Sequence, residues 1–273
     1  MSKSLYNFTF NDVEHPICIV TLIHGAGEHS GRYDYLRDRL AEHRMVTVMG
    51  DLPGHGHSPG QRGHIDSFDE YVNAALTFLE TARKRYGVDI PHVLFGHSMG
   101  GLIATLAVAR TNAQPDLLIL SSPAFGLRMK ISPLRKWVGR ALLPIAPRLT
   151  QQNGIRPEDV TRNRSIAKAY GTDHLVTHTV TLRWYFEFLS AMEKSFTECV
   201  HIHIPISIWQ GGADRLVDPE VVRQFVQSCE AQSISYKEFP ELYHEILNEP
   251  ERDAVIAEIV TWIKAHLPQC NSL

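Results

Sequence analysis

The sequence predicts an α/β fold, with a mostly parallel sheet covered by helices on both faces. The first observation is a series of short apolar runs rich in β-branched residues, at residues 17–23, 45–49, 93–95, 117–120, 204–209 and 233–239. The second is that segments with helical periodicity separate most of them, at residues 32–43, 68–86, 221–229 and 254–266. Alternating strands and helices require right-handed crossovers, so these strands should run parallel.

One interval breaks this alternation. Residues 122–203 contain no clear strand of the sheet, but they contain helix-like pieces at residues 133–145, 162–170 and 177–196. An insertion of about eighty residues is too long for a plain loop. We therefore expect a core formed by residues 1–121 and 204–273, and a helical cap formed by residues 122–203 over the edge of the sheet where the strands end.

Composition narrows the class of protein. At 273 residues and 44% hydrophobic, the chain can bury one sizeable core. Its 27 basic and 30 acidic residues nearly balance, so nothing points to nucleic acid as a partner. The four cysteines are scattered and no apolar run is long enough to span a membrane, which predicts a cytoplasmic protein. His201 and His203 would share one face of a strand, but no third ligand is visible, and no metal or other cofactor is predicted.

The stretch Gly96-His97-Ser98-Met99-Gly100 carries the most chemical information. An apolar strand enters it and an apolar helix pattern leaves it. Such a turn is so tight that glycine is needed on both sides of the serine, and it lifts the hydroxyl out of the sheet. Ser98 is therefore the predicted nucleophile. Met99 begins the helix, so its free N–H could stabilise an oxyanion.

A serine hydroxyl needs a histidine as base and a carboxylate to orient that histidine. Asp214 follows the strand at 204–209 through a glycine-rich exit, and His244 follows the strand that ends at residue 239. Both lie at the edge of the sheet where Ser98 should lie. The chain order Ser98, Asp214, His244 is also the order found in α/β-hydrolases.

Other acids near these positions are weaker candidates. Asp218 precedes Pro219, where it would more naturally cap the next helix. Glu241 and Glu245 flank His244, but neighbours on a loop seldom orient one another's side chains. His97 lies inside the tight turn and should pack beneath it.

Two glycine-rich loops complete the predicted site. In His24-Gly25-Ala26-Gly27-Glu28, after the first core strand, the Ala26 N–H could face the Met99 N–H across a carbonyl oxygen. Residues 51–58 superficially resemble a phosphate loop, but no apolar helix follows at once and no P-loop motif is present. We interpret that segment as a structural turn that shapes the floor of the site.

Taken together, these motifs resemble those of the monoacylglycerol lipases and lysophospholipases of the α/β-hydrolase superfamily, a group similar to the serine aminopeptidase S33 hydrolases. The resemblance is carried by residues 24–33, 51–58, 96–101, 211–217 and 243–245, in the family's order. It implies Ser98 as nucleophile, Asp214 and His244 as its partners, and an oxyanion hole formed by Ala26 and Met99. The chain departs from the family at its amino terminus, where a shorter segment precedes residue 17 and the first edge of the sheet should be reduced.

The resemblance implies a lipid ester as substrate. It favours a monoacylglycerol lipase, with a lysophospholipase, another esterase or a thioesterase as alternatives, and a non-catalytic binding protein on the same scaffold as a rival of another class. In the cap, six basic residues and no acidic ones lie between Gly126 and Arg148, beside an apolar stripe at helical spacing. This helix could touch an anionic membrane surface, or its stripe could pack on the core. A second apolar stretch, at residues 182–192, could line an acyl pocket or join the core.

Overall fold

The computed structural model describes residues 6–11, 13–129, 132–229 and 233–268. Its main sheet has seven strands in the order β1-β3-β2-β4-β5-β8-β9. These are β1 (Phe8–Phe10), β2 (Cys18–Ile23), β3 (Met45–Gly50), β4 (His92–His97), β5 (Leu117–Ser121), β8 (Ile206–Gly211) and β9 (Ile234–Phe239). Within this sheet of described strands, β1 alone pairs antiparallel, and the other neighbours pair in parallel. The predicted mostly parallel α/β sheet is confirmed.

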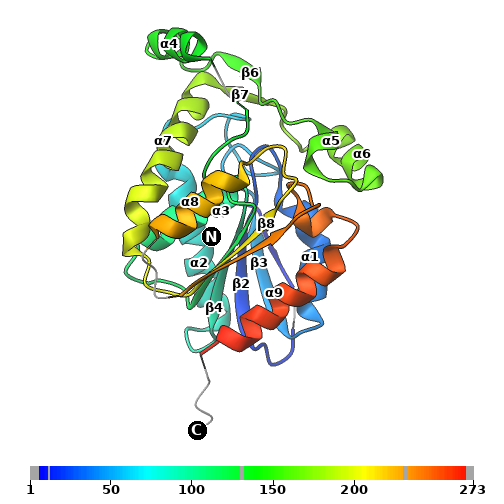
Figure 1. The fold of residues 1–273 in the computed structure, drawn as a ribbon. Helices are drawn as coiled ribbons and strands as arrows, with labels where there is room; N and C mark the ends of the chain where they lie inside the picture. Colours follow the sequence, from blue (N-terminus) through cyan, green and yellow to red (C-terminus); the bar gives the residue numbers. More distant parts are fainter. Residues whose placement is uncertain (1–5, 12, 130–131, 230–232, 269–273) are drawn as a thin grey trace.

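Helices cover both faces of the sheet (Figure 1). One face carries α1 (Asp34–Ala41) and α9 (Arg252–His266), and the other carries α2 (Asp69–Tyr86), α3 (Met99–Ala109) and α8 (Pro219–Ser228). Because both faces are covered, every residue of β2, β3, β4, β5 and β8 is buried. The edge strand β1 has only three residues, all partly exposed, in agreement with the expected reduced first edge.

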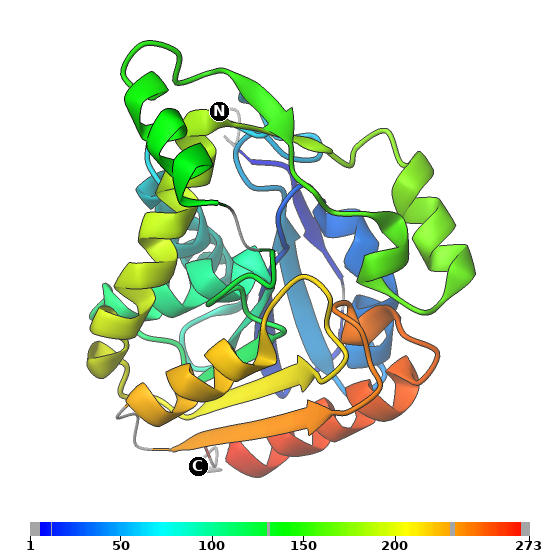
Figure 2. The ribbon, with the colours of Figure 1, turned by 45° about the horizontal axis from the view of Figure 1, so that its top comes forward.

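Residues 122–203 leave the sheet after β5 and return to it at β8. Their elements are α4 (Pro133–Leu142), β6 (Thr150–Gln152), α5 (Pro157–Val160), α6 (Arg164–Thr172), β7 (Thr179–Thr181) and α7 (Leu182–Glu198). Figures 1 and 2 show α4 and the α5–α6 pair on opposite sides, above the ends of the strands. We call these residues the cap segment.

Two predictions about the cap segment were wrong. It contains a small antiparallel sheet, in which β6 pairs with β7. The last helix begins at Leu182 and not at residue 177, because β-branched Thr179–Thr181 extend as a strand. The Thr181 side chain then caps the helix by accepting a hydrogen bond from the Trp184 N–H at 3.2 Å.

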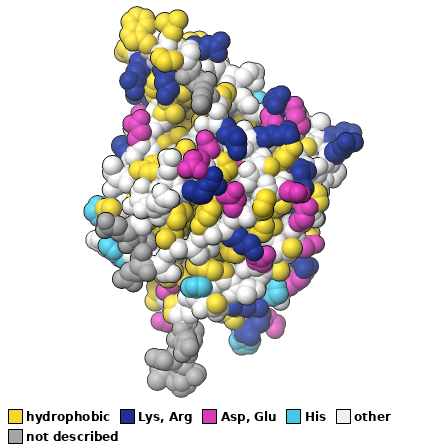
Figure 3. Space-filling view, viewed as in Figure 1, with side chains coloured by type: hydrophobic (Ala, Val, Ile, Leu, Met, Phe, Trp, Pro, Cys, Tyr) yellow, Lys and Arg dark blue, Asp and Glu magenta, His cyan; other side chains and the backbone are white. Residues whose placement is uncertain are grey.

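The two long cap helices pack differently. The α7 helix lies against α3, and Phe188 and Ala191 join the main hydrophobic core. In α4, the apolar stripe instead faces outward, with Trp137 69% exposed and, just beyond the helix, Ile145 81% exposed. Figure 3 shows apolar and basic side chains together at this end of the molecule. Of the two expectations for this stripe, packing on the core is therefore wrong.

Candidate active site

The turn around Ser98 has the tight geometry that the sequence predicts. Ser98 lies between β4 and α3 with φ 54° and ψ −120°, in a region that non-glycine residues rarely adopt. A Cβ on Gly96 would lie 2.3 Å from the carbonyl oxygen of Gly100, and one on Gly100 would lie 2.1 Å from that of Ile23. Only glycine fits at either position, and the serine hydroxyl is held at the carboxyl end of β4.

The structure brings the three predicted side chains together. The Ser98 Oγ lies 2.8 Å from His244 Nε2, and His244 Nδ1 lies 2.8 Å from Asp214 Oδ2. His244 and Asp214 are buried, after the carboxyl ends of β9 and β8. With the Nδ1–H donating to Asp214, Nε2 is free to accept the serine proton, which is the arrangement that activates a serine nucleophile.

The Asp214 carboxylate is fixed by four hydrogen bonds. Its Oδ1 accepts from the backbone N–H groups of Leu216 and Val217, at 2.8 and 3.0 Å. Its Oδ2 accepts from Gln210 Nε2 at 3.0 Å as well as from His244. Burial alone would raise the pKa of Asp214, but His244 and these donors outweigh it and lower the pKa. Sequence reasoning missed Gln210, whose only signal was an amide near the end of a buried strand.

The pKa values of the two histidines near Ser98 shift in opposite directions. Burial acts to lower the pKa of His244, but Asp214 and then Glu245 and Glu28 outweigh it, and the pKa is raised. The ring of His97 lies 4.9 Å away, and there burial lowers the pKa to about 4. Its Nδ1 lies 3.1 Å from Ser121 Oγ, so His97 packs beneath the turn as expected.

The loop that carries Ala26 approaches the same point. A Cβ on Gly25 would lie 3.1 Å from Ser98 Cβ, so this loop is in contact with the turn. Ala26 and Ser98 line one cavity. Within the described part of the chain, neither the Ala26 N–H nor the Met99 N–H donates to another protein group. An oxyanion hole formed by these two N–H groups stays a prediction.

A buried ionic cluster supports this loop, and sequence reasoning missed it. Arg32 Nη1 lies 2.8 Å from Glu28 and 2.6 Å from Glu245, and its Nη2 also donates to Glu245 at 2.8 Å. Glu28 also accepts from the Gly25 N–H at 2.6 Å. Burial acts to raise the pKa of Glu28, but Arg32 and nearby histidines outweigh it and hold the pKa at about 2. The guanidinium of Arg32 lies 4.6 Å from the ring centroid of Tyr170 in the cap segment.

The competing acids have other roles. Asp218 caps α8 by accepting from the Glu220 N–H at 3.1 Å, as predicted. Glu241 is exposed, and Glu245 pairs with Arg32 and not with the histidine before it. Asp214 is therefore the acid that reaches His244.

The loop at residues 51–58 is structural. Asp51 accepts from the N–H groups of Ser30 and His57, both at 2.8 Å, and His55 Nε2 accepts from the Gly27 N–H at 3.1 Å. These hydrogen bonds fix the position of the loop that carries Ala26. His201 and His203 do not lie on a strand, and among the described residues no group of three His, Cys, Asp or Glu side chains is placed to hold a metal ion.

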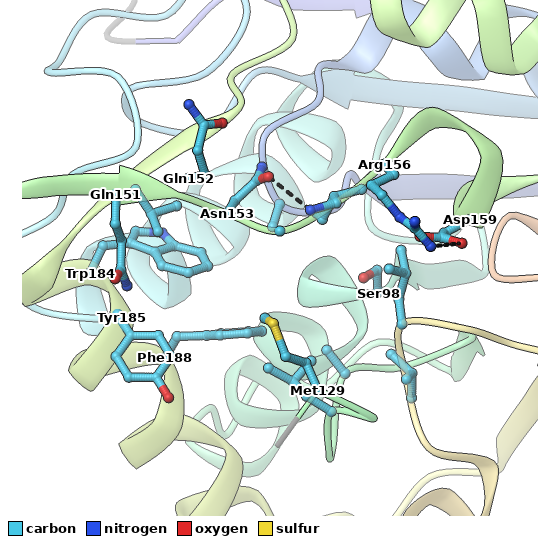
Figure 4. A pocket seen from close by; sticks show the side chains of 18 of the residues that line it. Ser98, Met129, Gln151, Gln152, Asn153, Arg156, Asp159, Trp184, Tyr185 and Phe188 are labelled. Atoms are coloured by element: carbon cyan, nitrogen blue, oxygen red, sulfur yellow. Dashed lines mark hydrogen bonds and ion pairs between the residues drawn. The ribbon is translucent and has the colours of Figure 1, made fainter. Parts of the chain in front are cut away.

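A cavity of about 420 Å³ opens above Ser98 and His244. Most of its apolar lining comes from the cap segment and the loop after β8, and includes Leu127, Met129, Ile155, Val180, Leu182, Trp184, Tyr185, Phe186, Phe188, Leu216 and Val217. In Figure 4, Ser98 lies near Arg156 and Asp159, and Trp184, Tyr185 and Phe188 lie at the opposite end. Part of the predicted acyl-pocket stretch therefore lines this cavity.

Comparison with known proteins places the chain in a family. The sequence matches the family described as serine aminopeptidase, S33, over residues 14–251. The chain belongs to this family. The phospholipase YtpA of Bacillus subtilis is 36% identical over 244 residues, which cover 89% of this chain and 93% of that protein. The monoacylglycerol lipase of Mycolicibacterium smegmatis is 30% identical over 253 residues, which cover 92% and 90%.

Solved structures agree with this assignment. The crystal structure of the monoacylglycerol lipase of Paleococcus ferrophilus superposes with a TM-score of 0.86 at 29% identity, covering 96% of this chain and 99% of that one. A soluble variant of the monoglyceride lipase of Saccharomyces cerevisiae gives a TM-score of 0.85 at 21% identity, covering 97% and 92%, and supports the fold alone. The fold of this chain is thus that of the α/β-hydrolase lipases.

Proposed function

We propose that the protein is a serine hydrolase that cleaves the carboxylic ester of lipids with a single acyl chain. The observation that carries this proposal is the hydrogen-bonded chain Ser98–His244–Asp214, with both contacts at 2.8 Å, at the floor of a cavity with an apolar far end. The protein is a carboxylic ester hydrolase by family. Relatives named monoacylglycerol lipase and phospholipase support a lipid ester as its substrate.

The geometry suits acyl transfer to Ser98 in two steps. His244 Nε2 removes the hydroxyl proton as Oγ attacks the ester carbonyl, and Asp214 stabilises the imidazolium that forms. The N–H groups of Ala26 and Met99 receive the negative charge of the carbonyl oxygen. His244 then gives its proton to the leaving alcohol. In the second step, water activated by His244 cleaves the acyl-serine ester and releases the fatty acid.

Monoacylglycerol and lysophospholipid both present one acyl chain on glycerol. The aromatic end of the cavity, at Trp184 and Phe188, can accept a single chain by apolar contact. The resemblance of the sequence favours monoacylglycerol, and the Mycolicibacterium smegmatis relative bears that activity in its name.

Substitution of the nucleophile tests the proposal. Ser98→Ala should lower kcat on a glycerol ester by about a thousandfold or more, without a change in Tm, because the three side chains act as a unit. A fluorophosphonate probe should label the wild type and the exposed-serine control Ser228→Ala, but not Ser98→Ala. Hydrolysis by Ser98→Ala near the wild-type rate would overturn the proposal. A wild type that stays unlabelled and inactive would support the non-catalytic rival.

The proposed function includes contact of α4 with an anionic membrane surface. Leu134, Trp137 and Leu142 on α4 are exposed, and Arg135 and Arg140 lie on the same helix. Apolar side chains beside basic ones are the pattern of helices that lie in a membrane interface. No helix of the described residues is long and apolar enough to cross a bilayer. Contact through α4 would place the cavity beside its lipid substrate.

Vesicle binding tests this contact. Wild-type protein should sediment with vesicles that contain anionic phosphatidylglycerol, and less with purely zwitterionic vesicles. Trp137→Ser should weaken sedimentation severalfold, because the indole is the largest exposed apolar group on α4. Val88→Ser is the matched control, since Val88 is 78% exposed and lies outside the cap segment. Equal loss in the two variants, or no binding by the wild type, would contradict the contact.

A further inference from the structure

The charge of the cavity differs in sign from that of the chain. The whole chain carries a formal net charge of −3. The described residues that line the cavity include four basic side chains, Arg135, Lys136, Arg156 and Arg215, and one acidic side chain, Asp159. The cavity is therefore cationic although the protein is acidic. Such a field concentrates anionic ligands and gives no advantage to a neutral one.

Two of these cations, Arg156 and Arg215, lie against the buried carboxylate of Asp159. Arg156 donates to Asp159 through Nε at 2.7 Å and Nη2 at 3.1 Å, and Arg215 Nη1 lies 3.4 Å from the same carboxylate. The Asp159 side chain is only 7% exposed, whereas those of Arg156 and Arg215 are 66% and 46% exposed. The two guanidinium groups share this buried carboxylate. The other acid beside them, Glu158 at 3.7 Å from Arg156, is 63% exposed and does not line the cavity, so N–H donors remain for a ligand there.

Arg215 is held in place next to the reacting groups. The guanidinium of Arg215 lies 4.1 Å from the ring centroid of Tyr243 and also bonds its hydroxyl. Arg215 directly follows Asp214 in the sequence, and Tyr243 directly precedes His244. A planar guanidinium fixed in this way loses little conformational entropy when it binds a second oxyanion.

The two ends of the cavity differ in chemistry, and this difference indicates how a substrate would be oriented in it. Figure 4 shows Arg156 and Asp159 near Ser98, and the aromatic side chains at the other end. An ester positioned at Ser98 with its acyl chain among Trp184 and Phe188 directs its alcohol toward the arginines. The glycerol backbone of a lysophospholipid places a phosphate only a few bonds from the acyl oxygen. Arginine forks match phosphate oxygens in charge and geometry, whereas the hydroxyl of a neutral glycerol carries no negative charge to pair with a guanidinium.

We propose that Arg156 and Arg215 are specificity-determining residues that bind the phosphate of single-acyl glycerophospholipids, so that these are preferred over monoacylglycerol, the substrate that the sequence resemblance favours. This inference rests on the proposed ester hydrolysis at Ser98. Arg156 and Arg215 lie outside α4, the helix proposed to contact a membrane.

The test compares two soluble substrates with the same short acyl chain, 1-acyl-lysophosphatidylglycerol and 1-monoacylglycerol, both below their critical micelle concentrations. The wild type should show the higher kcat/KM on the phosphate-bearing lipid, and the ratio of the two values should fall as salt is added. Arg156→Gln should lower that ratio about tenfold, mainly through KM, because a charge-assisted bond is lost. Arg215→Gln should act in the same direction. Arg164→Gln is the matched control, since Arg164 is exposed in the same segment and does not line the cavity.

The outcomes separate this inference from the proposed function. A wild type that prefers monoacylglycerol, or arginine variants that lower both activities equally, would overturn the phosphate site and leave ester hydrolysis standing. Absence of Ser98-dependent hydrolysis of either substrate would overturn the proposed function. A salt-sensitive preference for the phosphate that Arg156→Gln removes and Arg164→Gln retains supports the inference.

Discussion

Replacement of Arg32 by methionine should destabilise the protein far more than loss of an ordinary surface ion pair. The Arg32 side chain is 8% exposed, and the two carboxylates that it joins, Glu28 and Glu245, are each 5% exposed. Without the guanidinium, both carboxylates are buried without their cation. Breaking a buried pair in this way costs about 3–5 kcal/mol. For a chain of this size, that corresponds to a fall in Tm on the order of 10 °C.

The sign of the pH dependence follows from the pKa of Glu28. In the wild type Arg32 holds that pKa at about 2, below its ordinary value of 4.5, so the stabilisation is full above pH 4.5 and is lost as the pH falls toward 2. In Arg32→Met, burial is no longer outweighed by the guanidinium and raises the pKa of Glu28, so protonation relieves the cost. The deficit in the free energy of unfolding should therefore be largest near pH 8 and shrink as the pH is lowered.

Urea unfolding at several pH values measures this deficit. Arg37→Met is the matched control, because Arg37 lies in α1 and pairs with Asp34 and Asp38, whose side chains are 54% and 66% exposed. Exposed pairs contribute at most about 1 kcal/mol, so this control should change stability little. A deficit of Arg32→Met that equals that of Arg37→Met, or that does not change with pH, would refute the reasoning.

Three further predictions concern the site. The kcat/KM profile should fall on the acid side with an apparent pKa above 6.5, because His244 must be neutral and its pKa is raised; an acid limb centred below that value would contradict this. Asp214→Asn should lower kcat by about ten-thousandfold, whereas Asp218→Ala should cost about 1 kcal/mol of stability as a lost helix cap and leave kcat nearly unchanged; equal kinetic losses would show that the acid is misassigned. Gly100→Ala should lower Tm and activity together, because its methyl group would lie 2.1 Å from the Ile23 carbonyl oxygen; thermal unfolding that matches the wild type would speak against so tight a turn.

The sequence predicted the sheet well because its strands are buried on both faces. Such strands must be apolar throughout, and β2 and β4 stand out for that reason. Prediction from the sequence failed where the hydrophobic pattern of a segment does not reveal its place in the fold. All three residues of strand β6 (Thr150–Gln152) are exposed and polar, so the strand has no hydrophobic signal in the sequence. Its partner β7 is a strand because it pairs with β6. Strand β8 begins at Ile206, later than predicted, since Pro205 has no N–H to give the ladder.

The same distinction applies to the site. Ser98, Asp214 and His244 could be predicted because each has a signal in the neighbouring sequence, either flanking glycines or the end of a predicted strand. The ionic cluster could not be predicted, because Arg32 and Glu245 are separated by 213 positions and the sequence around one gives no indication of the other. The bond from Gln210 to Asp214 spans only four positions, but no motif predicts it, because it depends on how the chain turns after β8. Long-range polar contacts are set by the finished fold, and no local pattern encodes them.

The unequal anchoring of the cap segment bears on substrate selection. Beside His244, the segment is tied to the core by the Glu245 N–H, which donates to the Val160 carbonyl at 2.8 Å, and by Arg162, which pairs with buried Glu249. In α4, by contrast, Gly139 is the one buried residue, and the hydrogen bonds of this helix in the described part of the chain stay within residues 132–146. The end of the cavity that holds Asp159 is therefore the rigid one. A fixed carboxylate and its two arginines can discriminate between head groups, because preorganised charges need no reorganisation when a ligand binds. The acyl end, bounded by exposed α4, depends instead on apolar contact, which tolerates chains of different length.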